Sequence, residues 1–306
     1  MLWTALAIIY VVWGSTFFAI ALVVHSMPAL LAAGTRFLLA GVILAAVIAL
    51  RDRSALAVTP RQLGGAATVG ILLLVGGNGL VSLGERTVPS GLAALLIASI
   101  PLWVVVLRLV FGEHVGRDII AGITVGIVGV GVLVVPDGIS GHTDLAGLLM
   151  LVCAALLWAI GSFISPRLDM PRSAWGSTAY QMISGGLVLI IVGSLLGETR
   201  ALDPSRFSTE SLLGLAYLVV FGSLVAFSAY TWLLRNAPVS LVSTYAYVNP
   251  VIAVSLGTLF LSEPITPSMV VGAGLILAAV AFILQRFNHA RVAARSADAA
   301  SLRPAG

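Results

Sequence analysis

The stretch SLVSTYAYVNPVIAVSLGTLFLSEP, from Ser240 to Pro264, decides the fold that we expect for this chain. It is apolar and long enough to cross a bilayer as a helix, yet Asn249 and Pro250 stand at its centre. Because proline removes a backbone donor and clashes with the carbonyl four residues back, the helix is expected to kink or open there. A carbonyl freed at that depth must face protein or a wet cavity, since lipid offers it no water. Tyr245, one turn before Asn249 on the same helix face, completes the prediction of a pocket at mid-membrane.

The composition of the whole chain is that of an integral membrane protein. Of its 306 residues, 59% are hydrophobic and 9% are charged, and the mean hydropathy is +1.10. Soluble domains contain roughly 25% charged residues. Long unbroken apolar segments indicate helices and exclude a barrel, whose strands alternate in hydrophobicity. The arginines behind the net charge of +4 are scattered over short loops, so no nucleic acid is expected as a partner.

Ten transmembrane spans are predicted, each about 20 apolar residues long. Short connections with proline, glycine and asparagine turn signals separate them and leave no room for a soluble domain. The tail from Arg286 on is rich in alanine, arginine and serine and is predicted to be disordered. The predicted spans cover residues 3–22, 29–50, 63–84, 90–111, 119–135, 145–165, 174–197, 211–233, 239–261 and 268–285.

The distribution of arginine predicts the orientation, because cytoplasmic loops carry the excess of positive charge. The side without the termini holds three arginines, Arg86, Arg200 and Arg206, against twelve on the other side. Both termini are therefore expected in the cytoplasm, with the protein in the cell (inner or plasma) membrane. The twelve are Arg51, Arg53, Arg61, Arg108, Arg117, Arg167, Arg172, Arg235, Arg286, Arg291, Arg295 and Arg303.

The two halves of the chain repeat at a nearly constant offset. Five spans in each half is an odd number, so the second half is expected to sit upside down relative to the first. This is the inverted-repeat plan of secondary transporters, whose substrate site lies at the repeat interface near the midplane. The matched pairs, 145 to 150 residues apart, are Trp13 with Trp158, Arg36 with Gln181, Gly41 with Gly186, Pro101 with Pro250, Glu113 with Glu263 and Gly122 with Gly272.

Four motifs make the chain resemble a known family: WGSTFF (13–18), AGTRFLLAG (33–41), PSGLAALLIASIPLW (89–103) and STYAYVNPVIAVSLGTLFLSEP (243–264). With them the chain looks like the drug/metabolite transporter superfamily, and most like its EamA-type ten-helix exporters. The resemblance implies an all-α integral membrane protein whose ten transmembrane helices form two inverted five-helix repeats. The repeats would span residues 2–135 and 145–285, followed by a disordered cytoplasmic tail at 286–306. It also implies export of small metabolites or drugs by alternating access; several relatives move amino acids and related compounds.

Polar residues at membrane depth are the first candidates for a substrate site. Arg36 lies about 10 Å into its span, where an arginine costs roughly 2.5–3.5 kcal/mol on insertion scales. It either anchors a substrate carboxylate, or snorkels to the outer headgroups or caps a neighbouring helix end; Gln181 at the equivalent position favours a shared polar cavity. Pro101 and Pro250 are either structural kinks or opened helices that offer carbonyls to a ligand. Asn249 either bonds substrate or bridges two helices.

Aromatic residues near mid-span are the second group of candidates. Trp13 and Trp158 lie too deep for interfacial anchors, so they either pack helices together or line a pocket for apolar or aromatic substrates. Tyr230 and Tyr245 add rings for stacking and hydroxyls for hydrogen bonds. Asn78 stands among glycines, which indicate close helix contact first and a ligand second.

The acidic residues determine what we expect of proton coupling. None of the five Glu or seven Asp lies in the central third of a span; Glu85 is at a loop edge, and Glu113 and Glu263 are at span ends, where either could gate. Proton-coupled exporters often bury an acid whose pKa is raised by desolvation. The sequence therefore predicts weak or no dependence on a central acid, with simple facilitation as one form of transport.

A transporter is the function that these features predict. One buried arginine, no buried acid and many aromatics favour an anionic or zwitterionic amphipathic solute. A channel or a membrane sensor is the alternative. An intramembrane enzyme has the least support, because it would need a nucleophile–base pair, a metal cluster or a carboxylate dyad at depth. No metal or cofactor is expected; the expected partners are a small-molecule substrate and the lipid bilayer, and the small-residue faces are compatible with a homodimer.

Overall fold

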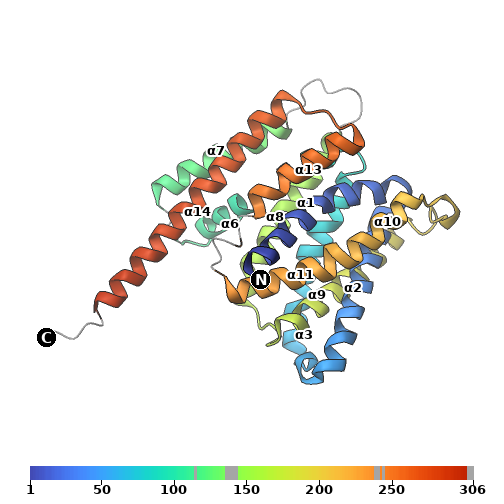
Figure 1. Ribbon diagram of the computed structural model, residues 1–306, viewed down its shortest axis with the longest axis horizontal. Helices are drawn as coiled ribbons and strands as arrows, with labels where there is room; N and C mark the ends of the chain where they lie inside the picture. The colour runs from blue at the N-terminus through green and yellow to red at the C-terminus, as the bar shows by residue number, and fades with distance from the viewer. Residues whose placement is uncertain (114–115, 135–143, 238–241, 243–244, 302–306) are drawn as a thin grey trace.

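The computed structural model describes residues 1–113, 116–134, 144–237, 242 and 245–301, and every regular element in them is a helix (Figure 1). Seven spans in this part of the chain are long and apolar enough to cross a membrane. Three shorter apolar helices cover residues 118–134, 245–261 and 267–283. The protein is thus an all-α membrane protein with about ten helices, as predicted.

Most of the spans are single helices whose bounds lie within a few residues of the predicted ones, except that α14 extends well past its predicted end. Their apolar side chains face lipid or neighbouring helices, while the backbone satisfies itself internally, as a bilayer requires. These helices are α1 (Leu2–Ser26), α2 (Ala29–Arg51), α7 (Arg117–Val134), α8 (Leu145–Ile164), α9 (Ala174–Leu195), α13 (Tyr245–Leu261) and α14 (Pro267–Ser301).

Three spans are divided into shorter pieces. Two of them carry a π-helical segment, a wider turn that occurs frequently at functional sites. These are the third span, with α3 (Pro60–Gly70), the π-helix η2 (Ile71–Gly79) and α4 (Leu80–Gly84), and the eighth, with α10 (Thr209–Tyr217), the π-helix η5 (Leu218–Val225) and α11 (Ala226–Asn236). The fourth span consists of α5 (Ser90–Ile97) and α6 (Ile100–Val110).

The two prolines expected to break their spans behave differently. At Pro101 the chain leaves the helix after Ile97 and starts α6 at Ile100, which places the proline in the first turn, where its missing donor costs nothing. Pro250 instead lies inside α13, which continues without interruption to Leu261. The expected opening is therefore present in the fourth span and absent from the described part of the ninth.

Spans related by the repeat pack against each other. α2 lies along α9, and α7 lies along α14, as Figure 1 shows at one edge of the bundle. Glycines make the first contact close: a Cβ at Gly186 would lie 2.6 Å from the backbone nitrogen of Leu38. Small residues of this kind let helix backbones approach in lipid. The glycine pairs 41/186 and 122/272, matched by the repeat, lie at these contacts.

Two carboxylates of the second half cap the N-termini of helices in the first half. Glu198, after α9, accepts hydrogen bonds from the backbone nitrogens of Leu30 (3.2 Å) and Leu31 (2.9 Å) at the start of α2. Glu263, after α13, accepts from Ser90 (2.7 Å) and Gly91 (3.0 Å) at the start of α5. Each acid satisfies helix-end donors and complements the helix dipole. Both lie at one end of the bundle, here called the outer end because the arginine distribution predicts that it faces away from the cytoplasm.

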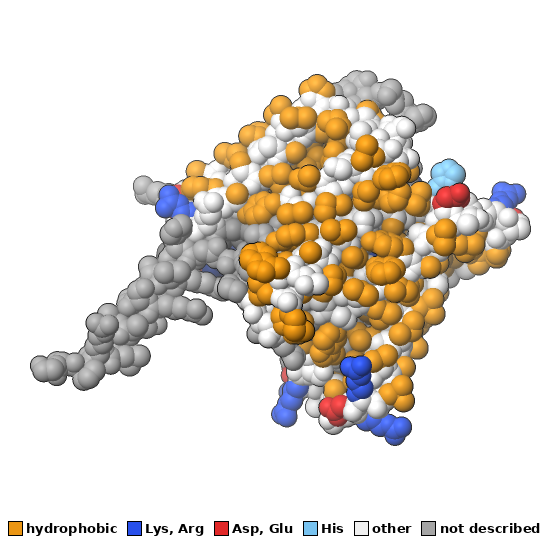
Figure 2. Space-filling model, in the orientation of Figure 1, with side chains coloured by type: hydrophobic (Ala, Val, Ile, Leu, Met, Phe, Trp, Pro, Cys, Tyr) orange, Lys and Arg blue, Asp and Glu red, His pale blue; other side chains and the backbone are white. Residues whose placement is uncertain are grey.

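The last helix extends past its apolar part. α14 continues to Ser301, whereas the segment from Arg286 was expected to be disordered. Alanine and arginine have high helix propensities, so a helix that leaves the bundle can continue through such a segment. Figure 2 shows hydrophobic side chains over the broad central face and charged ones towards its margins, as suits a bilayer.

Candidate functional site

A central cavity with a volume of about 100 Å³ lies between α1, α2, η2, α5, α8, α11 and α13. Its walls come from both halves of the chain, and its depth is that of the middle of the spans. Six of the ten predicted site residues line it: Trp13, Arg36, Asn78, Trp158, Tyr245 and Asn249.

An aromatic cluster forms one wall. The ring of Trp13 lies 5.2 Å from that of Tyr245, edge to face, and 5.4 Å from that of Phe227, also edge to face. Tyr230 packs behind them, 5.0 Å from Trp13. The indole nitrogen of Trp13 donates to the carbonyl of Gly222 in η5 (3.3 Å). Such contacts fix the ring positions, so the wall is a rigid apolar surface.

The opposite wall depends on a glycine. A Cβ at Gly77 in η2 would come within 2.7 Å of Cε3 of Trp158, so this position must be small for the indole to lie against η2. The neighbouring Asn78 donates from Nδ2 to the carbonyl of Leu73 at 3.5 Å, the long limit for a hydrogen bond. The glycines of the third span therefore serve helix contact, as the sequence indicated, and the same contact places Trp158 in the cavity.

Arg36 brings a charge to the cavity. Its side chain is buried, with 5% exposed, and Nε donates to Ser223 Oγ in η5 at 3.0 Å. The guanidinium carbon lies 4.6 Å from the centre of the Phe37 ring. Among the residues that the structure describes, no carboxylate lies within ion-pair distance of the guanidinium. Glu85 attracts it only from beyond that distance, so the desolvation penalty of this buried cation is not offset by a direct ion pair, and a bound anion would relieve it.

Asn249 bridges two helices. With its nitrogen turned towards the neighbouring carbonyls, the amide donates to the carbonyl of Tyr10 (3.2 Å) and to that of Tyr245 (3.1 Å). It thereby ties α13 to α1, and Gly14 leaves the space for this close contact. Of the two roles expected for Asn249, the geometry accounts for the bridging one.

Four predicted residues do not line the cavity. Tyr230 supports Trp13 from behind, and Pro101 starts α6. Gln181 lies at the contact between α3 and α9, where its amide donates to Ser177 Oγ at 3.0 Å. Pro250 borders a separate groove between α13 and α14. The polar symmetry expected between Arg36 and position 181 is therefore not realised within the cavity.

Sequence reasoning missed three features of the site. The π-helices η2 and η5 occupy corresponding places in the two halves: η2 contributes Gly77 and Asn78 to the cavity wall, and η5 accepts the hydrogen bonds of Trp13 and Arg36. Ser223, the partner of Arg36, was not singled out, because one serine in an apolar run carries no signal. Glu85, expected at a loop edge, is 6% exposed. The chain turns inward after α4 and also buries Val88, at 3%, so the acid lies inside the bundle.

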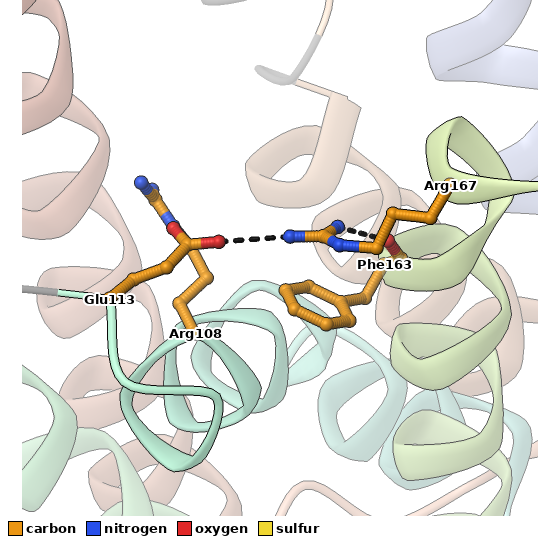
Figure 3. Close-up of polar contacts among 4 residues, drawn as sticks. All are labelled: Arg108, Glu113, Phe163 and Arg167. Atoms are coloured by element: carbon orange, nitrogen blue, oxygen red, sulfur yellow. Dashed lines mark hydrogen bonds and ion pairs between the residues drawn. The ribbon is translucent and has the colours of Figure 1, made fainter.

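An ion-pair cluster joins the two halves at the opposite end of the bundle (Figure 3). The carboxylate of Glu113, after α6, accepts from Arg108 Nε (2.6 Å) and from Arg167 Nη2 (2.9 Å). Arg167 also donates to the carbonyl of Phe163 (2.6 Å) and stacks 3.9 Å over its ring. The hydrogen bond from Arg108 lowers the pKa of the Glu113 carboxyl below its ordinary value, and the charge of Arg167 adds to this effect.

A bundle of about ten helices around a small cavity with one charge and an aromatic wall has the architecture of a membrane carrier. The chain belongs to the EamA-like transporter family, whose model matches residues 1–135 and 145–285. It is therefore a membrane transporter of the drug/metabolite superfamily.

Relatives of known sequence agree with this assignment. The chain is 36% identical to the "Uncharacterized inner membrane transporter YedA" of Escherichia coli (strain K12), over 92% of this chain and 90% of that one. It is 27% identical to a "Probable amino-acid metabolite efflux pump" of Salmonella typhimurium, over 94% and 95%. A solved structure titled "Crystal structure of protein" matches with a TM-score of 0.63 at 19% identity, over 93% and 97% of the two chains. That likeness concerns the fold alone.

Proposed function

We propose that this transporter exports small amphipathic metabolites, namely amino acids or related zwitterionic or anionic compounds, or drugs of that character. The observation that carries the proposal is Arg36, a buried cation that faces the cavity without a carboxylate partner among the described residues. A ligand carboxylate would supply the missing charge through charge-assisted hydrogen bonds. The amino-acid metabolite efflux pump among the relatives supports the solute class and the direction of transport.

The rest of the ligand would lie against the aromatic wall. Trp13 and Tyr245 present ring edges and faces close to Arg36, and Trp158 closes the other side. A flat or branched apolar group fits such walls, because aromatic contacts add to the gain from apolar burial. A cationic ligand would meet the repulsion of Arg36 and is excluded as the preferred substrate.

Alternating access would use the contacts between the two halves. At the outer end, Glu198 and Glu263 of the second half hold the starts of α2 and α5. At the other end, Glu113 holds Arg167 across the halves. In the proposed cycle the outer contacts break when the cavity opens outward, and the Glu113 cluster holds the cytoplasmic end closed. Both termini lie in the cytoplasm in this scheme.

A matched panel in proteoliposomes tests the solute class. L-Phenylalanine, phenylacetate and phenyltrimethylammonium share one ring and differ in charge, so the expected order of saturable efflux has the first two well above the cation. Arg36→Gln should reduce efflux of the first two at least tenfold, while Arg206→Ala, at an exposed arginine, should not. A preference for the cation would refute the proposal. Accelerated exchange of labelled solute against unlabelled solute would identify a carrier, whereas flux without saturation would indicate the alternative, a channel.

A further inference from the structure

Glu85 is a buried acid that the proposed substrate site does not use. It follows directly after α4 at the outer end, and 6% of it is exposed. Within the described part of the chain, neither carboxyl oxygen has a hydrogen-bond partner. The hydroxyl of the nearby Ser90, the first residue of α5, is buried without a partner as well. Buried polar groups are normally satisfied, so an acid with two unsatisfied oxygens requires an explanation.

The two charges near Glu85 do not, on balance, stabilise its ionised form. Glu263 after α13 repels it more strongly than Arg36 on α2 attracts it. Arg36 lies beyond ion-pair distance and directs Nε to Ser223. The oxygens of Glu263 are directed to two backbone donors of α5. The other ionisable side chains at this end of α1, of the following loop and of α8 are exposed: His25, Arg86 and Asp144.

The neutral acid is therefore the form that fits this conformation. An ionised carboxylate in a low-dielectric interior costs several kcal/mol unless a charge or hydrogen bonds compensate it. Opening the outer end would admit water to the segment between α4 and α5, and a hydrated carboxyl ionises at neutral pH. Burial of this side chain is therefore linked to the binding of a proton, and its exposure to water is linked to the release of that proton.

We propose that Glu85 is a proton-binding site of this transporter: the outer end closes only when Glu85 carries a proton, and outward opening releases that proton to water. One proton moves from water to a carboxylate oxygen on closing and returns on opening, with no other bond changed. This differs from the weak dependence on acids that the sequence predicted. The conformational part rests on the alternating access proposed above, whereas the proton site itself does not.

Infrared difference spectra of the purified protein test the proton site directly. Between acidic and alkaline buffer, the wild type should lose the carbonyl stretch of a protonated carboxyl group and gain carboxylate bands. Exposed carboxyl groups are already ionised at neutral pH, so the part of this change that occurs between neutral and alkaline pH reports a buried acid. That part should be missing in Glu85→Gln and retained in Glu210→Gln, which alters an exposed acid of α10. The same neutral-pH change in the wild type and in Glu85→Gln would overturn the proposal.

Thiol accessibility tests the link to opening without any substrate. In a Cys153→Ser background, Ser82→Cys places a thiol on α4, where Ser82 is 4% exposed, and a membrane-impermeant maleimide probes it. Ser205→Cys in an exposed loop corrects for the ionisation of the thiol itself. After this correction, labelling at 82 should rise with pH by up to about tenfold per unit, as one proton requires, and Glu85→Gln should abolish the rise.

The outcomes separate this proposal from the proposed substrate class. Labelling at 82 that follows position 205 at every pH, with or without Glu85→Gln, would overturn the link between proton and opening. A pH-dependent rise that needs Glu85 would support it even if none of the phenyl compounds were transported. Conversely, efflux of L-phenylalanine together with pH-independent labelling would leave the substrate class standing and exclude Glu85 as the proton site.

Discussion

Replacing Glu263 by alanine should weaken the outer end of the bundle measurably. The carboxylate accepts two backbone hydrogen bonds, at 2.7 and 3.0 Å, from the first residues of α5. Ser90 is fully buried, so water replaces the lost acceptor poorly. Hydrogen bonds to a charged group contribute about 1.5–3 kcal/mol each, and a lost helix cap costs about 1 kcal/mol. Because Glu263 is itself partly exposed, we expect a net loss of about 2–3 kcal/mol of folding free energy.

Thermal unfolding in detergent measures this loss. With about 2 °C per kcal/mol for a chain of this size, the apparent melting temperature should fall by about 4–6 °C. Glu263→Gln keeps one carbonyl acceptor and should fall by less than Glu263→Ala. Glu210→Ala removes an exposed acid from the first turn of α10 and serves as the matched control. If Glu263→Ala and Glu210→Ala lowered the melting temperature equally, the carboxylate would not hold α5 as described.

Three further predictions concern packing and pH. Gly186→Ala should reduce folded yield strongly, because its Cβ would lie 2.6 Å from a backbone nitrogen of α2, whereas Gly274→Ala, with no described atom within 4 Å of the added Cβ, should fold normally in the same size-exclusion assay. Gly77→Ala should displace Trp158, seen as a change in tryptophan fluorescence, and reduce L-phenylalanine efflux several-fold. Because the folded pKa of Glu113 is lowered, its ion pairs stabilise the protein above the usual glutamate pKa. This stabilisation is lost as the pH falls through the folded pKa. The melting temperature of the wild type should therefore fall in acid by an amount that E113Q lacks.

Much of the fold follows from local properties of the sequence. In a bilayer each backbone group must be satisfied within its own segment, so a run of apolar residues of sufficient length becomes a helix whatever its neighbours. This is why the predicted bounds of α2, 29–50, and α9, 174–197, agree closely with the observed ones, Ala29–Arg51 and Ala174–Leu195. The depth of Arg36 follows from the same count of residues along a helix.

Proline was a weaker guide than hydropathy. A proline removes one donor and crowds one carbonyl, but whether the helix opens depends on what surrounds it. At Pro101 the chain pauses and α6 starts anew, while around Pro250 the contact with α1 holds α13 together, with Asn249 donating across the interface. The sequence offered two roles for Asn249, a substrate contact and a bridge between helices, and the packing of α13 on α1 accounts for the bridge.

By itself, the sequence determined that this protein spans a membrane with about ten helices and that Trp13, Arg36 and Trp158 lie at the depth of a central site. It did so because hydropathy and helical rise are local quantities. Only the tertiary structure decided that Arg36 meets Ser223, that Gln181 lies outside the cavity, and that Glu85 is enclosed. Those outcomes depend on which helices come together and how a short loop turns between them. They are set by contacts between side chains that lie far apart in the sequence, and the periodicity within one span does not specify such contacts.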